Sequence, residues 1–371
     1  MKSLAILVLA VLLLGNLTSV AIAKNNSSNL ADPADYTKEI YEVRTKDGFS
    51  VTLTRYVGSK RPSIMLIHGM GCNHKIFDFD ENHSLARFLA KEGWDVWLLD
   101  LRTHDGDGDY ILGKLRGVDS DIEFICRYWD FDKTYLKIDV VTAIDFIKQK
   151  TSYSKIFLGG HSYGGYLAYA YAELIGEENL AGIITTGASA MAAPLSYAKP
   201  LSELYKAGLK IGERVFVRPF SCQIRRYLKI IPRNYENYKP LPSMFYDYTT
   251  KREIQLACTF MGDNEPMGVW VDMYFGKDPR FYGGHWVDPQ TLYDYTENLH
   301  KITVPFLAIA GDNDTQDPKD DIFKTFENVS SKNKEFLHFA KHSHMDLLLG
   351  ENASSLIFPE ISNWLNLRIS S

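Results

Sequence analysis

The chain has 371 residues, of which 45% are hydrophobic and 13% aromatic, so it can bury a large core. Its formal net charge of −5 is small for this length, and no basic tract dominates the sequence. This charge balance argues against a nucleic-acid partner, and the length suits one large domain or one domain with an insertion.

The first 23 residues have the pattern of an export signal. Met1–Lys2 is a short basic start, residues 4–14 are an unbroken apolar run, and Ala21–Ile22–Ala23 has the small-x-small form of a cleavage site. Because the run is short for a bilayer span, we predict a removed signal peptide over 1–23; an uncleaved anchor is the alternative. Export predicts a secreted, periplasmic or lysosomal protein.

An exported chain meets an oxidising compartment, where cysteines can pair. The four cysteines are Cys72, Cys126, Cys222 and Cys258. We favour a Cys222–Cys258 disulfide because both residues fall in the same predicted insertion, and four unpaired, buried cysteines are the alternative.

Strands and helices alternate along most of the chain. Residues 39–58 alternate in hydrophobicity around Lys46–Asp47–Gly48, which predicts a hairpin. Further strands are predicted at 63–67, 94–101, 181–187, 304–311 and 334–340, and just before Gly160. Helices are predicted at 84–92, 137–148, 317–327 and 354–365, and directly after Gly164. The alternation predicts an α/β fold with a doubly wound, mostly parallel sheet.

Two stretches interrupt this alternation. Residues 103–133 are a long connection rich in Asp and Gly. Residues 192–300 differ in texture from their surroundings and fall between two predicted core strands. We therefore predict an inserted cap over 192–300, with a core formed by residues 24–191 and 301–371.

The pentapeptide Gly160–His161–Ser162–Tyr163–Gly164 has the form Gly-x-Ser-x-Gly, between a predicted strand and a predicted helix. In such a turn the serine adopts a strained backbone, so that its hydroxyl stands free at the top of the sheet. Glycines on both sides avoid collisions with the neighbouring strand and helix. This context predicts that Ser162 is a catalytic nucleophile.

A serine nucleophile needs a base to take its proton and a carboxylate to orient that base. In a parallel sheet such groups lie beyond the carboxyl ends of the strands. Asp314 follows the strand at 304–311 and is the predicted acid. Asp312 is the alternative, and Asp317 is expected to cap the next helix.

The loop after the strand at 334–340 supplies the predicted base, His344. His342 is the alternative, and His338 is expected to point into or across the sheet and to be structural. The order of serine, acid and histidine, each after its own strand, is that of α/β-hydrolases.

The oxyanion that forms during acyl transfer needs two backbone N–H donors. The residue after the nucleophile, Tyr163, is one predicted donor. The loop His68–Gly69–Met70–Gly71 follows the first buried strand and has small residues for close backbone approach. We predict the amide of Met70 as the second donor.

These residues together resemble the acid lipase type of α/β-hydrolase, the family of gastric and lysosomal acid lipases. The similarity takes in the opening hairpin, His68–Gly69–Met70, residues 84–97, residues 139–147, the motif at 160–164, Gly311 with Asn313–Asp314, and His344–Met345–Asp346. It covers the core from about 37 to 190 and from 303 onward, and it implies the α/β-hydrolase fold. The chain departs from the family pattern at residues 100–104 and at Tyr163.

The predicted cap is rich in aromatic residues, which suits a water-excluding cover for an apolar acyl group; alternatively, these rings form the cap's own core. They include Phe245, Tyr246, Phe260, Trp270, Tyr274, Phe275, Tyr282 and Trp286. Basic and apolar residues mix at 214–231. That segment suits contact with a lipid surface, although a solvated amphipathic helix is the favoured interpretation.

These features predict an exported serine hydrolase that cleaves carboxylic esters, with lipid or other apolar acyl esters as substrates, through an acyl-enzyme. The alternatives are a thioesterase, peptidase or acyltransferase on the same fold, or a non-catalytic binding protein that keeps the fold. We expect no cofactor and no metal, since no Cys–His spacing suits zinc. The calcium-like start at 105–109 is followed by Tyr110 and Arg116 where a glycine and a glutamate are needed.

Overall fold

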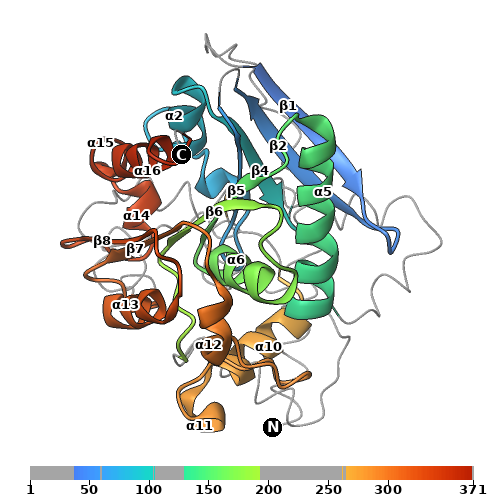
Figure 1. Ribbon diagram of the computed structural model, residues 1–371, viewed down its shortest axis with the longest axis vertical. Coiled ribbons are helices and arrows are strands. Elements are labelled where there is room, and N and C mark those ends of the chain that lie inside the picture. Colours follow the sequence, from blue (N-terminus) through green and yellow to red (C-terminus); the bar gives the residue numbers. More distant parts are fainter. Residues whose placement is uncertain are drawn as a thin grey trace, which may run out of the picture. The chain divides into compact units, whose positions relative to one another are not determined.

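One sheet organises the part of the chain that the computed structural model describes, namely residues 37–58, 61–102, 104, 129–192, 261 and 265–369. Its eight strands lie in the order β1-β2-β4-β3-β5-β6-β7-β8 (Figure 1). They are β1 (Thr37–Arg44), β2 (Ser50–Val57), β3 (Ser63–Ile67), β4 (Asp95–Asp100), β5 (Ile156–His161), β6 (Leu180–Thr186), β7 (Phe306–Gly311) and β8 (Lys334–Phe339). Strand β2 runs antiparallel to both β1 and β4, and the remaining neighbours are parallel. The predicted α/β fold with a mostly parallel sheet is confirmed.

Helices cover both faces of this sheet (Figure 1). The longer ones are α2 (Leu85–Lys91), the π-helical η3 (Phe131–Val140), α5 (Val141–Lys150), α6 (Tyr163–Leu174), α10 (Met267–Lys277), α13 (Lys319–Asn328) and α16 (Phe358–Asn366). Shorter turns are η2 (His74–Ile76), α11 (Pro279–Tyr282), α12 (Tyr295–Asn298), η7 (Leu299–Lys301), α14 (Asp346–Leu349) and α15 (Ala353–Leu356). No helix among the described residues is long and apolar enough to cross a bilayer.

Side chains alternate between the two faces along each strand, so each face has its own apolar cluster. In β3, Met65 and Ile67 join the cluster that includes residues of α5 and α6. Ile64 and Leu66 join the cluster that includes residues of α2 and α16. All four side chains are buried, as expected for a central strand of a parallel sheet.

Two helix predictions differ from the structure. Helical backbone begins at Phe131 rather than at residue 137, because the carboxylate of Asp130 caps it by accepting the N–H groups of Lys133 and Thr134. The predicted helix at 354–365 is two helices, α15 and α16. Pro359 lies in the first turn of α16, where its missing N–H is tolerated, so a new helix begins there.

The structure describes Met261 and residues 265–300 of the predicted cap. There Trp286 stacks on Tyr295 with ring centroids 4.0 Å apart. Its ring also lies 5.3 Å from that of Phe131 and 5.4 Å from that of Tyr166, which belong to η3 and α6. These rings belong to the apolar cluster that includes residues of α5 and α6. The extent of the cap stays a prediction.

Several predictions concern segments outside the described residues. They are the signal peptide at 1–23, the cysteines at 126, 222 and 258, the calcium-like stretch at 105–109, the basic and apolar stretch at 214–231, and the aromatic residues at 245, 246 and 260. Cys72 lies within the described residues and is half-buried.

Candidate active site

Ser162 lies in a sharp turn between the end of β5 and the start of α6. Its backbone has φ 54° and ψ −119°, a conformation that costs about 1–3 kcal/mol and is typical of functional turns. A Cβ on Gly160 would lie 2.1 Å from the carbonyl carbon of Gly164, and one on Gly164 would lie 2.0 Å from the carbonyl oxygen of Ile67. Only glycine fits at both positions, so the predicted strand–turn–helix is present.

A cavity lies over this turn and brings together residues from distant loops. It is lined by Gly69, Met70, Cys72, His161, Ser162, Tyr163, Tyr166, Gln316, Asp317, His344 and Met345. Ser162 comes from the β5–α6 turn and His344 from the loop after β8, so the sheet brings the serine and the imidazole to one cavity.

His344 and Asp314 form a buried hydrogen-bonded pair. The distance from His344 Nδ1 to Asp314 Oδ2 is 2.7 Å, and both side chains are almost fully buried. The other carboxylate oxygen, Asp314 Oδ1, accepts the backbone N–H groups of Gln316 at 2.8 Å and Asp317 at 3.0 Å. These bonds fix the direction of the carboxylate, and with it the orientation of the imidazole.

The electrostatics of His344 follow from this pairing. Burial by itself lowers the pKa of the imidazole, because a charged ring is poorly solvated there. The negative charge and the hydrogen bond of Asp314 outweigh burial and raise the pKa of His344 above its usual value. An imidazolium at this position is therefore stabilised.

The alternative acid and bases lie elsewhere. Asp312 accepts from His338 Nδ1 at 2.9 Å and lies 3.1 Å from Lys319 Nζ, near the surface. His338, expected to point into or across the sheet, does not point into the core: its side chain is half-exposed and bonds to Asp312, which follows the neighbouring strand β7. His342 is buried, with Nε2 2.9 Å from the side-chain oxygen of Asn352, and is absent from the residues that line the cavity.

The two predicted oxyanion donors lie at the cavity. Tyr163 is the first residue of α6, and Met70 follows β3 on the facing loop. A Cβ added at Gly69 would lie 3.4 Å from Ser162 Cβ, so this loop passes close to the serine. The side chain of Glu265, itself buried, accepts the N–H of Gly71 at 2.8 Å and braces the loop. No sequence signal distinguishes Glu265 from other acidic residues.

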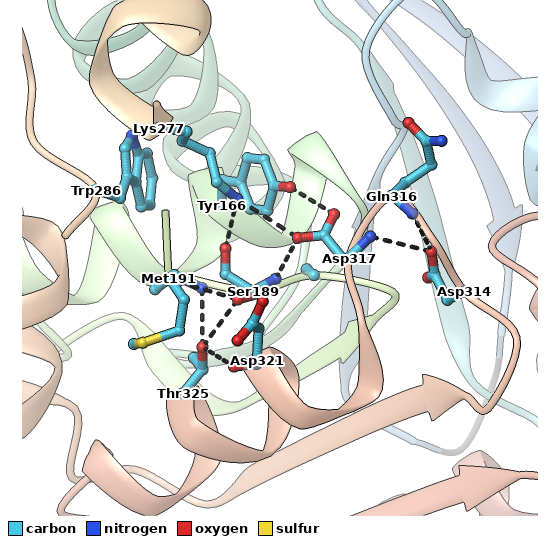
Figure 2. Close-up of polar contacts among 12 residues, drawn as sticks. Tyr166, Ser189, Met191, Lys277, Trp286, Asp314, Gln316, Asp317, Asp321 and Thr325 are labelled. Atoms are coloured by element: carbon cyan, nitrogen blue, oxygen red, sulfur yellow. Dashed lines mark hydrogen bonds and ion pairs between the residues drawn. The ribbon is translucent and has the colours of Figure 1, made fainter. Parts of the chain in front are cut away.

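The expectation that Asp317 caps the next helix is wrong. Helix α13 begins at Lys319, two residues later, and Asp317 is buried at the cavity. Its carboxylate accepts the Tyr166 hydroxyl at 2.5 Å and the Ser189 N–H at 3.0 Å (Figure 2). A buried ammonium, that of Lys277, lies 3.4 Å from Asp317 Oδ1. Neither buried charge was predicted as part of the site.

Within the described ranges, no group of three or more His, Cys, Asp or Glu side chains is arranged to hold a metal ion. The described side chains that line the cavity include the Ser162 hydroxyl, the His344 imidazole and the Asp317 carboxylate.

The comparisons with known proteins agree with this geometry. The alpha/beta hydrolase fold family model matches residues 62–215. Human lipase member M is 31% identical over 160 residues, which cover 39% of this chain and 36% of that protein. Rat gastric triacylglycerol lipase is 24% identical over 394 aligned positions, which cover 91% of each chain.

A solved structure of a putative lipase from Sulfolobus solfataricus has a TM-score of 0.61 at 17% identity, covering 90% of this chain and 95% of that one. At this identity the likeness concerns the fold. The chain spans 36% of the length of human lipase member M and 42% of that of Arabidopsis thaliana triacylglycerol lipase 1. The predicted resemblance to an α/β-hydrolase of the acid lipase type is confirmed.

Proposed function

Because the chain is an α/β-hydrolase of the acid lipase type, we propose that it is a serine hydrolase that cleaves carboxylic esters of apolar acyl groups, including lipids. Ser162 is the nucleophile, His344 the general base and Asp314 the acid that orients His344. The amides of Met70 and Tyr163 are the oxyanion donors.

The proposal rests above all on the buried hydrogen bond between His344 Nδ1 and Asp314 Oδ2, at 2.7 Å, beside the strained turn of Ser162. With Nδ1–H donated to the carboxylate, the second ring nitrogen is left unprotonated and can accept the serine proton. A merely structural histidine does not require a serine at a positive φ in the same cavity.

In the proposed reaction, Ser162 Oγ attacks the ester carbonyl carbon while His344 Nε2 takes the hydroxyl proton. The carbonyl oxygen becomes an oxyanion, which the Met70 and Tyr163 amides stabilise. His344 then returns its proton to the leaving alkoxide, and an acyl-enzyme remains on Ser162. Water repeats the sequence, giving the free acid and the original serine.

The substrate class is proposed from the relatives, and the cellular setting from the segment at 1–23. The relatives named above include a gastric triacylglycerol lipase. The signal-like segment at 1–23 supports export, so we propose that the enzyme acts outside the cytoplasm, in a secreted, periplasmic or lysosomal setting. Contact of the predicted cap with a lipid surface belongs to the same proposal.

The test is hydrolysis of p-nitrophenyl esters of graded acyl length by the wild type, Ser162→Ala and the matched control Ser355→Ala, whose side chain is exposed on α15. We expect Ser162→Ala to lose at least about 10⁴-fold in kcat and the control to lose nothing. Retained activity in Ser162→Ala refutes the assignment.

Labelling by a fluorophosphonate probe distinguishes an activated serine from a non-catalytic binding protein, because only an activated serine reacts. If the wild type labels but hydrolyses thioesters or peptides in preference to esters, the triad stands and the proposed substrate class is wrong.

A further inference from the structure

Lys277, the last residue of α10, has a fully buried ammonium group. Its Nζ donates to the carbonyl oxygen of Ser189 at 2.7 Å and lies 3.4 Å from Asp317 Oδ1. It also lies 3.7 Å from the centre of the Tyr166 ring, in the geometry of a cation–π contact. Burying an ammonium is costly unless it is paired, so these contacts hold Lys277 at this position.

Asp317 connects this ammonium to the catalytic pair. Its carboxylate accepts hydrogen bonds from Tyr166 and Ser189, and its backbone N–H donates to Asp314 Oδ1 at 3.0 Å (Figure 2). Asp317 and His344 line the same cavity. One residue therefore contacts both the Lys277 ammonium and the carboxylate that orients His344.

The charges that face His344 come from several elements. Asp314 and Asp317 lie on the loop after β7, and Lys277 lies on α10. His161 of β5 packs against the other side, with ring centroids 4.6 Å apart, and burial followed by the charge of His344 lowers the pKa of His161 well below its usual value. His161 is thus neutral, and among the residues that the structure describes, the charges that act on His344 are those of Asp314, Asp317 and Lys277.

A further carboxylate, Asp321 of α13, lies beside Thr325 in Figure 2 and acts on the ammonium of Lys277. It interacts with the ammonium through charge alone, without a hydrogen bond. Burial lowers the pKa of the Lys277 ammonium, and the neighbouring carboxylates raise it. Burial is the larger effect, so the pKa is lowered overall.

We propose that the buried Lys277–Asp317 pair is a positioning device for the catalytic base, in which Asp317 holds the Asp314 loop and Lys277 neutralises the second carboxylate beside His344. This inference rests on the proposed roles of Ser162, Asp314 and His344. With the pair intact, His344 experiences one uncompensated carboxylate, that of Asp314. The charge of the site then suits a base that must gain and release a proton in each cycle.

Removing either charge of the pair is expected to change the pKa of His344, which a purely structural role does not predict. Lys277→Met removes the positive charge in nearly the same volume. Burial raises the pKa of Asp317 and the Lys277 ammonium is the largest influence that lowers it, so the effect on His344 is expected above the pH at which Asp317 ionises in this variant. The second carboxylate then favours the imidazolium, so the pKa of His344 rises. Asp317→Asn removes the negative charge and lowers the pKa of Lys277 further, because burial is then less opposed. At every pH at which Lys277 keeps its proton, the ammonium disfavours the imidazolium, so the pKa of His344 falls.

The experiment measures the acidic limb of kcat/KM for a p-nitrophenyl ester between pH 4 and pH 9. We expect its midpoint to shift upward by about 0.5–1 pH unit in Lys277→Met and downward by a similar amount in Asp317→Asn. In the double variant the two shifts cancel to within about 0.3 units. The matched control is Lys319→Met, which breaks the exposed Lys319–Asp312 pair on the same segment and leaves the midpoint unchanged.

A second readout is independent of turnover. In a Ser162→Ala background, the titration of the His344 imidazole is followed by NMR for the same variants. Thermal unfolding identifies any variant that does not fold, and in that case the other single variant retains a predicted direction of shift.

The outcomes separate the two proposals. If Ser162→Ala remains active, the proposed function fails, whatever the NMR shifts are. If Ser162→Ala is inactive but folded Lys277→Met and Asp317→Asn shift the midpoint in the same direction or not at all, the positioning role is refuted and the triad stands. Opposite shifts that cancel in the double variant support the inference.

Discussion

Replacing Asp314 by asparagine turns one of its two carboxylate oxygens into an NH₂ group. The hydrogen bonds around the side chain decide which of the two positions the NH₂ group takes. Asp314 Oδ1 accepts two backbone N–H groups, from Gln316 and Asp317, whereas Oδ2 accepts His344 Nδ1 at 2.7 Å. In Asp314→Asn the amide oxygen stays with the two backbone donors, because an NH₂ group there would face them without an acceptor. The NH₂ group therefore faces His344.

An NH₂ group can only donate, so it holds the imidazole with Nδ1 as acceptor and the ring proton on Nε2. That nitrogen then has no lone pair to receive the proton of Ser162. The fold is expected to be retained, because the number of hydrogen bonds is unchanged. The expected loss in kcat is about 10⁴-fold, which corresponds to about 5 kcal/mol in activation free energy.

The assay is steady-state hydrolysis of a p-nitrophenyl ester on the pH plateau, with thermal unfolding to verify the fold. Asp312→Asn is the matched control, since its carboxylate lies on the same loop but faces His338 and Lys319 at the surface. Asp314→Asn retaining more than about a tenth of wild-type kcat, in a folded protein, would refute the reasoning from hydrogen-bond direction. An equal loss of kcat in Asp312→Asn would mean that Asp314 had been wrongly assigned as the acid.

Three further changes test the packing and the charges of the described structure. In Gly187→Ala the new methyl group lies 3.0 Å from His344 Nδ1 and 3.2 Å from Asp314 Oδ2, at φ +56°. We expect kcat to fall by about ten- to a hundredfold, and wild-type rates would contradict this close approach. Burial, with neighbouring carboxylates, raises the pKa of Asp272 to about 7. The folded state therefore binds this proton more tightly than the unfolded state does. This contribution to stability is lost as the pH rises from about 4 to about 7. Urea titrations should show Asp272→Asn more stable than wild type by about 1–2 kcal/mol at pH 8, with a smaller difference at pH 5. A difference in the free energy of unfolding that does not grow with pH would contradict the raised pKa of Asp272. Trp286→Ala removes a buried ring from the core and should lower the free energy of unfolding by about 3–5 kcal/mol; a loss below about 1 kcal/mol would place the ring outside the packed core.

Short-range pattern was sufficient for the sheet and for the turn around Ser162. The predicted strands end within two residues of the observed ones, because the apolar runs that form them and the turn residues that bound them are local features of the sequence. The glycines at 160 and 164 belong to the same local pattern, since the turn that needs them is formed by five consecutive residues. Helix boundaries were harder to predict, because the cap at Asp130 and the break before Pro359 depend on single residues.

The order of residues after the strands predicted Asp314 as the acid and His344 as the base, and left Asp312 and His342 as alternatives on the same loops. Asp312 and Asp314 stand two positions apart on one loop, and both are carboxylates. The fold turns Asp314 inward, where two backbone N–H groups and His344 bind it, and leaves Asp312 at the surface. His344 and His342 differ in the same way: His344 bonds to Asp314, whereas His342 bonds to the side chain of Asn352.

The buried pair of Lys277 and Asp317 had no sequence signal, since lysines and aspartates at the ends of helices are ordinarily solvated. The two residues stand 40 positions apart, and their contact exists because α10 and the loop after β7 meet over the ring of Tyr166. The sequence by itself therefore determined the sheet, the strand–turn–helix around Ser162 and the residue types in the loops after the later strands, all of which follow from local periodicity and chain order. Only the tertiary structure decided which charges are taken out of water and placed beside His344, because burial is a property of packing between distant segments.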